Sequence, residues 1–291
     1  MDYCFDTSAF GAKNTASLYD DSDRAAVVAG LLASGRVVIS AVNVIEACGC
    51  EDPARRIGLL RLQSQLSREH RPLLVPNELL RELTIARHRG DRTATITISD
   101  RHSGIWWGLH EPEQLSEVER AEVYQWKKSL ELPFNQAQQQ TRSEFEKMFR
   151  AFPQNKPLSV AKFIKFLRQN EKLILDAASP AHQRITGVGL DFSEMHKLFQ
   201  ELPAWPLYLA GWAYSLYHRA IKAQGFGVLS NPGTVDLMSA IYLNYCDYFI
   251  TSDVKQRRAL RVLNVFNSRQ PKTQVISYQE FRNRLIIRSA A

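Results

Sequence analysis

Both ends of this 291-residue chain alternate between strand-like and helix-like patterns, and that alternation limits the fold more than any other feature. From the first residues onward, the patterns predict a strand over 2–6, a helix over 20–34, a strand over 36–40, a helix over 41–47, a strand over 73–75 and a helix over 76–87. Toward the end they predict a helix over 235–245, a strand over 247–251, a helix over 254–263, a strand over 273–277 and a helix over 279–287. This alternation is typical of parallel βαβ units.

The middle of the chain has a different pattern. It predicts mostly helices, over 115–130, 134–152, 159–177 and 192–223, with prolines at 133, 153, 157 and 180 at the expected breaks. We therefore expect one discontinuous α/β domain made of residues 1–91 and 227–291, with residues 92–226 as a mainly helical insertion.

Composition and charge narrow the class of protein. Hydrophobic residues make up 45% of the chain and charged residues 23%, which is ordinary for a globular domain. The net charge of +7 fits a polyanionic partner, although many proteins without such a partner share it. No apolar run approaches the roughly 18 residues of a membrane span, and the first residues lack a signal-peptide pattern. We expect a cytoplasmic protein that does not enter a membrane.

Several common kinds of site have no matching motif. The four cysteines show no paired CxxC spacing and the seven histidines no HxxxH spacing, which disfavours zinc and indicates reduced thiols. No glycine-rich phosphate loop follows the first predicted strand, and no nucleophile elbow is present.

Four acidic residues recur at one predicted position. Asp6 ends the first strand, Glu46 lies in the helix that Ser40 caps, Asp236 lies in the first turn of a helix, and Asp253 follows the strand over 247–251. Because strand carboxyl ends and the helix starts that follow them share one edge of a parallel sheet, we expect these four side chains to converge. Oxygen-only ligands suit Mg²⁺ or Mn²⁺, and such ions support phosphodiester hydrolysis.

Four short stretches together resemble the PIN-domain nuclease family. They are Tyr3-Cys4-Phe5-Asp6-Thr7-Ser8, Ile39-Ser40-Ala41-Val42-Asn43-Val44-Ile45-Glu46, Val235-Asp236-Leu237-Met238-Ser239-Ala240 and Tyr248-Phe249-Ile250-Thr251-Ser252-Asp253. The resemblance covers roughly residues 1–90 and 228–291, and the insertion has no counterpart in compact members of that family. It implies a Rossmann-like three-layer αβα sandwich around a mostly parallel sheet, an acidic Mg²⁺ or Mn²⁺ pocket and cleavage of single-stranded RNA.

The resemblance also implies roles for individual residues. Asp6, Asp236 and Asp253 would be metal ligands, directly or through water, and Glu46 would complete the set and orient the attacking water. Thr7 or Thr251 would hold a carboxylate in place.

Each acid also has a simpler reading. Asp6, Asp236 and Asp253 could be helix caps, and Glu46 a solvated helix residue. Glu78 and Glu82 are second-rank candidates for the site.

Basic and aromatic residues offer candidates for nucleic-acid contacts. Lys255, Arg257 and Arg258 follow Asp253 directly, and Arg87 and Arg89 form part of a second basic cluster. Either group could equally be a solvated cationic face. Trp106 and Trp107 could stack on unpaired bases or pack in the core of the insertion.

The sequence thus predicts a Mg²⁺- or Mn²⁺-dependent endoribonuclease that hydrolyses single-stranded or looped RNA through four carboxylates. Two alternatives stay open: a non-catalytic PIN-like scaffold that binds RNA or protein, and a DNA-directed nuclease of a defence or repair system. A toxin-like role with a paired inhibitor protein, or assembly into a homo-oligomer, would be compatible with the same residues.

Overall fold

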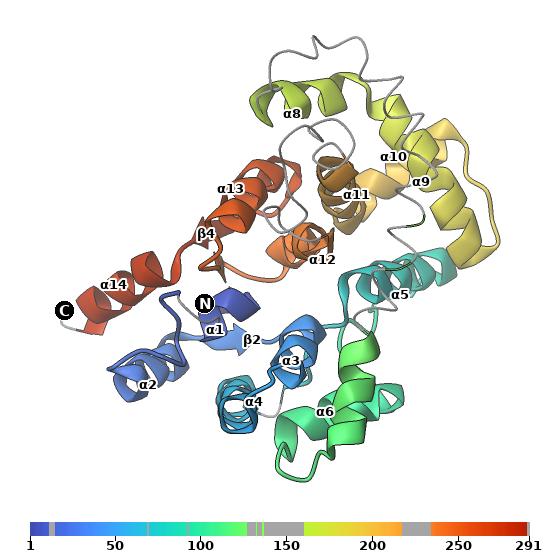
Figure 1. The fold of residues 1–291 in the computed structure, drawn as a ribbon. Coiled ribbons are helices and arrows are strands. Elements are labelled where there is room, and N and C mark those ends of the chain that lie inside the picture. The colour runs from blue at the N-terminus through green and yellow to red at the C-terminus, as the bar shows by residue number, and fades with distance from the viewer. Residues whose placement is uncertain are drawn as a thin grey trace.

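The computed structural model describes residues 1–11, 15–68, 70–91, 93–126, 160–216 and 234–289, together with Leu132 and Gln136. Its centre is a four-stranded sheet with the strand order β2-β1-β3-β4, in which every neighbouring pair is parallel. The strands are β1 (Asp2–Phe5), β2 (Arg36–Val38), β3 (Tyr248–Ile250) and β4 (Gln274–Ile276). The predicted α/β class, the parallel sheet and these four strands are confirmed (Figure 1).

One face of the sheet is covered by the helices α1 (Thr7–Gly11), α2 (Arg24–Ser34) and α14 (Tyr278–Ser289). The Phe281 ring meets Tyr3 and Phe5 of β1 edge-on, with ring centroids 5.7 and 5.4 Å apart, and Phe5 also contacts Phe10 of α1. Helix α2, near the start of the chain, packs against α14, near its end (Figure 1). Aromatic burial on this face therefore joins segments distant in sequence.

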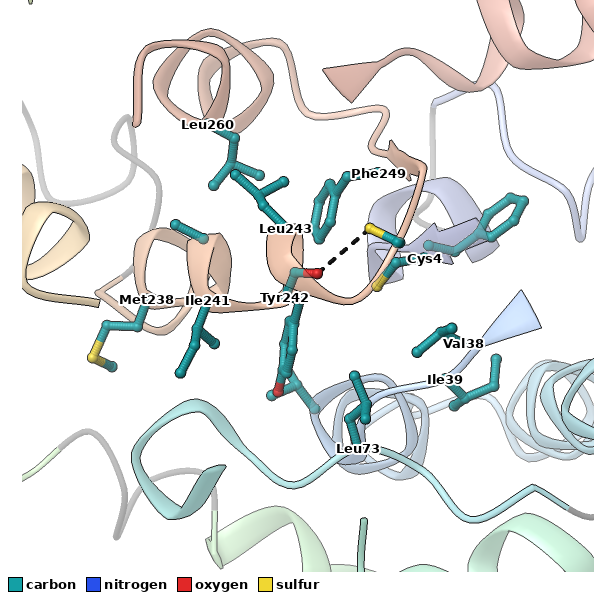
Figure 2. Packing of buried hydrophobic residues seen from close by; sticks show 14 of the residues in the cluster. Cys4, Val38, Ile39, Leu73, Met238, Ile241, Tyr242, Leu243, Phe249 and Leu260 are labelled. Atoms are coloured by element: carbon teal, nitrogen blue, oxygen red, sulfur yellow. Dashed lines mark hydrogen bonds between the residues drawn. The ribbon is translucent and has the colours of Figure 1, made fainter. Parts of the chain in front are cut away.

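The opposite face packs against helices from the last third of the chain. Figure 2 shows Cys4 and Phe249 of the sheet near Leu243, which belongs to the 3₁₀ helix η4 (Ser239–Asn244), and Leu260, which belongs to α13 (Val254–Leu263). Tyr242 crosses this layer, and its hydroxyl donates to the Leu74 carbonyl at 2.8 Å. Helices thus cover both faces of the sheet.

Further helices complete the part of the chain that the structure describes. They are α3 (Ala41–Cys48), α4 (Pro53–Ser67), α5 (Pro76–Arg89), the 3₁₀ helix η1 (Asp100–His102), α6 (Ser103–His110), α8 (Val160–Gln169), α9 (Glu171–Thr186), α10 (Phe192–Glu201), α11 (Ala204–Leu216), α12 (Thr234–Met238) and the 3₁₀ helix η5 (Asn264–Phe266). Residues 117–126 are also helical, whereas the helix expected over 134–152 lies outside the described residues except at Gln136.

Several expected elements differ in detail. The strand expected over 73–75 forms only isolated bridges, from Leu73 to Ser40 and to Thr97. The helix expected over 235–245 changes from α12 to the tighter η4 after Met238. The helix expected over 192–223 is interrupted between α10 and α11, because Pro203 disfavours helical backbone at the residue before it. Pro180, expected at a break, lies inside α9.

The helical middle of the chain shares a core with the sheet. Trp205 of α11 is fully buried, and its indole N–H donates to Thr84 Oγ1 of α5 at 3.1 Å. Helix α11 also packs closely on α12, where a side chain at Gly211 would overlap the Leu237 carbonyl oxygen. The insertion therefore supports the helix that carries Asp236. Across the described ranges, no helix combines the length and apolar character needed to cross a membrane.

Candidate functional site

The chain reverses its strand order between β1 and β3. Strand β2 lies on one side of β1 and β3 on the other, and the helices that follow β1 and β3 cover opposite faces of the sheet. In open α/β sheets, a crevice that binds ligands forms at such a reversal, outside the strand carboxyl ends. Asp6 follows β1 directly, and Thr251, Ser252 and Asp253 follow β3. Two of the four predicted acids thus lie at this position.

The Asp6 carboxylate accepts from four hydrogen-bond donors. Its Oδ2 accepts from the Ser8 backbone N–H at 3.0 Å, from Ser8 Oγ at 2.6 Å and, at 3.4 Å, from Thr251 Oγ1, and its Oδ1 accepts from Gln256 Nε2 at 3.2 Å. Each carboxylate oxygen offers about two acceptor positions. These bonds therefore fix the Asp6 rotamer and leave acceptor capacity on Oδ1.

Ser8 joins the two loops at the sheet edge. Its Oγ donates to Asp6 and accepts from the backbone N–H groups of Ser252 at 3.0 Å and Asp253 at 3.1 Å. One hydroxyl proton and two lone pairs are then all used. The Ser8 side chain therefore links the loop after β1 to the loop after β3.

Gln256 connects the same loops from α13. Its side chain is 1% exposed, its Oε1 accepts from Thr251 Oγ1 at 2.6 Å, and its Nε2 reaches Asp6 Oδ1 and, at 3.4 Å, the Asp236 carbonyl oxygen. Thr251 Oγ1 therefore contacts both Gln256 and, at 3.4 Å, Asp6 Oδ2. The supporting role of Thr251 stays a prediction. The Asp236 backbone belongs to the same network.

Glu46 reaches this edge through α3. Ser40 and Asn43 form a reciprocal cap at the start of α3, and Asn43 Nδ2 donates to the Phe5 carbonyl at 3.0 Å and to Thr7 Oγ1 at 3.3 Å. Residues three apart lie on one face of a helix, so Glu46 follows Asn43 toward the end of β1. Thr7 thus positions α3 and contacts no carboxylate in these bonds.

Asp6 and Glu46 interact electrostatically. Burial raises the pKa of Asp6 above its ordinary value, the nearby Glu46 charge raises it further, and hydrogen bonds from Ser8 and Gln256 act in the opposite direction. Two neighbouring carboxylates in a buried setting favour either a shared proton or a bound cation. This pair is the strongest indication of a functional site at the sheet edge.

Asp253 has the capping role that the sequence left open. Its Oδ1 accepts from the backbone N–H groups of Lys255 at 2.6 Å and Gln256 at 2.9 Å, at the start of α13. Asp6 likewise precedes α1, and Phe10 N–H donates to its carbonyl oxygen. Capping and ligand binding are compatible, because a capped carboxylate retains a second oxygen.

The residues present fit a partly hydrated ion better than a fully enclosed one. Within the described ranges, no group of three or more His, Cys, Asp or Glu side chains could hold a metal ion. Mg²⁺ is commonly held by one or two carboxylates, with water and substrate phosphate completing its shell. The Asp6–Glu46 pair supplies such a set, with Asp236 in α12 and Asp253 at the start of α13.

The predicted cations fall into two separate places. Lys255 and Arg258 are exposed on the first turns of α13, next to Asp253, and Arg257 approaches Glu280 at 3.8 Å. Arg87 forms an ion pair with Glu201 at the end of α10, and Arg89 is exposed nearby. At 1.5 Å per residue, Arg87 lies roughly 17 Å along α5 from the start of that helix. The α13 cations are thus the ones adjacent to the candidate site.

The second-rank acids have other partners. Glu78 Oε2 lies 3.0 Å from His102 Nε2, and the Ser99 backbone N–H donates to His102 Nδ1 at 3.1 Å. Glu82 pairs with Arg101 at 3.1 Å. Because a backbone donor faces His102 Nδ1, the ring proton belongs on Nε2 and points at Glu78.

Sequence reasoning missed three residues of the site: Ser8, Asn43 and Gln256. Two of them had a signal. Ser40-x-x-Asn43 and Asp253-x-x-Gln256 have the spacing of a helix capping box. The pattern identifies Asn43 as a cap partner, but only the tertiary structure directs Gln256 to Asp6 instead of back to its own helix.

Comparisons with known proteins leave the chain without an assigned family. No model of a protein family matches it, and no curated protein and no solved structure matches it.

Proposed function

We propose that this protein is a metal-dependent endoribonuclease with a PIN-like, Rossmann-type three-layer fold. The observation that carries the proposal is that Asp6 stands at the reversal point between β1 and β3, close enough to Glu46 for the charge of Glu46 to raise the pKa of Asp6. A divalent cation would relieve this repulsion, and oxygen ligands favour Mg²⁺ or Mn²⁺. The order of the four acidic motifs along the chain supports the same reading.

The chain's own residues divide the work as follows. Asp6 and Glu46 would bind the ion, Asp236 and Asp253 would join the shell directly or through water, and Glu46 would orient the attacking water. Ser8, Thr251 and Gln256 each donate to the Asp6 carboxylate and hold its rotamer. When bound, Mg²⁺ or Mn²⁺ supplies positive charge at the phosphodiester and makes water a stronger nucleophile at neutral pH.

A single RNA strand is the proposed substrate. The net charge of +7 and the exposed Lys255 and Arg258 beside Asp253 support a polyanion at this edge. Contacts of this kind position a backbone without reading bases. A cytoplasmic location is part of the same proposal.

Cleavage of labelled oligonucleotides tests the proposal. Single-stranded RNA, hairpin RNA and single-stranded DNA would be incubated with Mg²⁺, Mn²⁺ or EDTA, using wild type, Asp6→Asn and Glu46→Gln. Glu194→Gln, in the exposed first turn of α10, is the matched control. We expect metal-dependent cleavage of RNA that Asp6→Asn and Glu46→Gln abolish and that Glu194→Gln retains.

Other outcomes favour the alternatives. Cleavage of DNA in preference to RNA would indicate the DNA-directed nuclease. Binding of RNA without cleavage under any metal condition would contradict the enzyme and favour the PIN-like scaffold. Cleavage that persists in folded Asp6→Asn would contradict the proposed site.

A further inference from the structure

A second candidate site lies beside η1 and α6, and its lining includes none of the four predicted metal ligands. It is a cavity of ≈ 210 Å³ whose lining includes Arg71, Ser99, Asp100, Ser103, Trp106 and Trp107. Pockets for whole drug-sized ligands usually measure about 300–1,000 Å³. The cavity is therefore of a size for one flat group and not for a complete small molecule.

One wall of the cavity is fixed in place. Arg71 donates from Nη1 to the Ile98 carbonyl at 3.2 Å and from Nη2 to Asp100 Oδ1 at 3.0 Å. Its guanidinium lies over the Trp106 ring, 5.3 Å from the ring centroid. Three contacts thus hold a planar cation against an indole before any ligand arrives.

The neighbouring Trp107 is presented to solvent. Half of this residue (50%) is exposed, although the Trp106 ring beside it packs on His110 with centroids 3.9 Å apart. A single exposed aromatic residue is common. Here, however, it borders a cavity that also contains a fixed guanidinium, a carboxylate and two hydroxyl groups.

We propose that this cavity binds one unpaired base of single-stranded RNA, stacked on Trp107 and flanked by the Arg71–Trp106 wall. Flat aromatic and guanidinium surfaces are how proteins hold splayed bases, and hydroxyl and carboxylate groups then bond to the base edges. The choice of RNA rests on the proposed function. The cavity would give the helical insertion a role in holding substrate, separate from the acidic residues.

Binding measured without metal tests this inference apart from cleavage. In EDTA, fluorescence anisotropy would report the Kd of labelled decauridylate for wild type, Trp107→Leu and Trp107→Phe. Phe192→Leu on α10 is the matched control, because Phe192 is also 50% exposed. We expect about tenfold weaker binding for Trp107→Leu, the change that corresponds to about 1.4 kcal/mol of lost stacking, and near wild-type binding for Trp107→Phe and Phe192→Leu.

A ligand without bases identifies the contact. A decameric ribose-phosphate chain lacking bases should bind wild type and Trp107→Leu equally. The salt dependence of decauridylate binding should also have the same slope for both proteins, because Trp107→Leu removes no phosphate contact. Equal decauridylate affinities for wild type and Trp107→Leu, or an equal loss with the base-free chain, would overturn the inference. Cleavage failing while the Trp107 effect persists would overturn only the proposed function.

Discussion

Gln256 Nε2 donates to Asp6 Oδ1 at 3.2 Å, although the two residues are 250 positions apart in the chain. The same amide reaches the Asp236 carbonyl oxygen, and its Oε1 accepts from Thr251. A neutral, buried side chain from α13 thus contacts Asp6 after β1, Thr251 after β3 and the backbone of α12 at Asp236.

Replacing Gln256 should therefore destabilise the protein. Gln256→Leu keeps the volume but removes the amide oxygen that accepts from Thr251 Oγ1 and the amide N–H that donates to Asp6 Oδ1, which costs about 1–3 kcal/mol of unfolding free energy. Urea unfolding in EDTA measures the loss. Gln279→Leu, at an exposed position on α14, should change stability by less than about 0.5 kcal/mol. Equal stabilities for the two variants would show that the buried network contributes nothing.

The Asp6 carboxyl should give an unusual pH dependence. Burial and the Glu46 charge raise the pKa of Asp6 above its ordinary value of 3.8. Between pH 3.8 and this raised pKa, the folded protein holds a proton that the unfolded chain has released. Asp6 consequently lowers stability as pH rises through its folded pKa. In metal-free buffer, the unfolding free energy of Asp6→Asn relative to wild type should increase as the pH rises above 3.8.

Glu280→Gln provides the control with the opposite sign. The Ser277 backbone N–H is the main cause that holds the pKa of Glu280 below 4.5, so this group adds stability above that pH and loses it as pH falls. Replacing Glu280 by Gln should lower the unfolding free energy most near neutral pH. Parallel pH profiles for Asp6→Asn and Glu280→Gln would contradict the assigned environment of Asp6.

Asn43 should be coupled to Ser40. Asn43 is 2% exposed and bonds to Ser40, Phe5 and Thr7, so Asn43→Ala should cost about 2 kcal/mol. Ser40→Ala removes part of the same cap, and the double variant should lose less than the sum of the two single losses. Strict additivity in urea unfolding would mean that the cap does not act as one unit.

RNA binding should depend on salt through α13. Arg258 is exposed beside the candidate site, and losing one phosphate contact lowers the slope of log K against log salt by about 0.7 for a single strand. We expect this change for Arg258→Gln. Lys197→Gln, whose side chain is 70% exposed on α10, should keep the wild-type slope. A similar slope change for both variants would indicate diffuse binding to the whole basic surface.

The sheet could be predicted because its strands carry strong local signals. The β-branched run before Ser40 and the apolar run over 248–250 are buried on both faces, as parallel strands require, and they formed β2 and β3. Ser40 was predicted as a cap and is one. Short apolar segments were less certain, since Leu73 to Val75 had the composition of a strand but only isolated bridges.

The site could be predicted only in part. Acids placed after strands converge because of sheet geometry, which explains why Asp6, Thr251 and Asp253 were identified. Ser8 and Gln256 were not, because their hydrogen bonds between the two loops span about 250 residues, and the capping-box spacing of Asp253 and Gln256 does not indicate the bond from Gln256 to Asp6. The helical middle was harder still: Pro180 lies inside α9, where tertiary packing outweighs a local preference.

Titration with Mn²⁺ tests the central claim most directly, because it needs no knowledge of the RNA target. Electron paramagnetic resonance of free Mn²⁺ would follow binding to wild type, Asp6→Asn and the exposed control Glu194→Gln at neutral pH, with melting curves to verify folding. The account predicts saturable binding by wild type and Glu194→Gln, and at least about tenfold weaker binding by Asp6→Asn, a loss of about 1.4 kcal/mol. Equal binding by folded Asp6→Asn and wild type, or no binding by either, would contradict it.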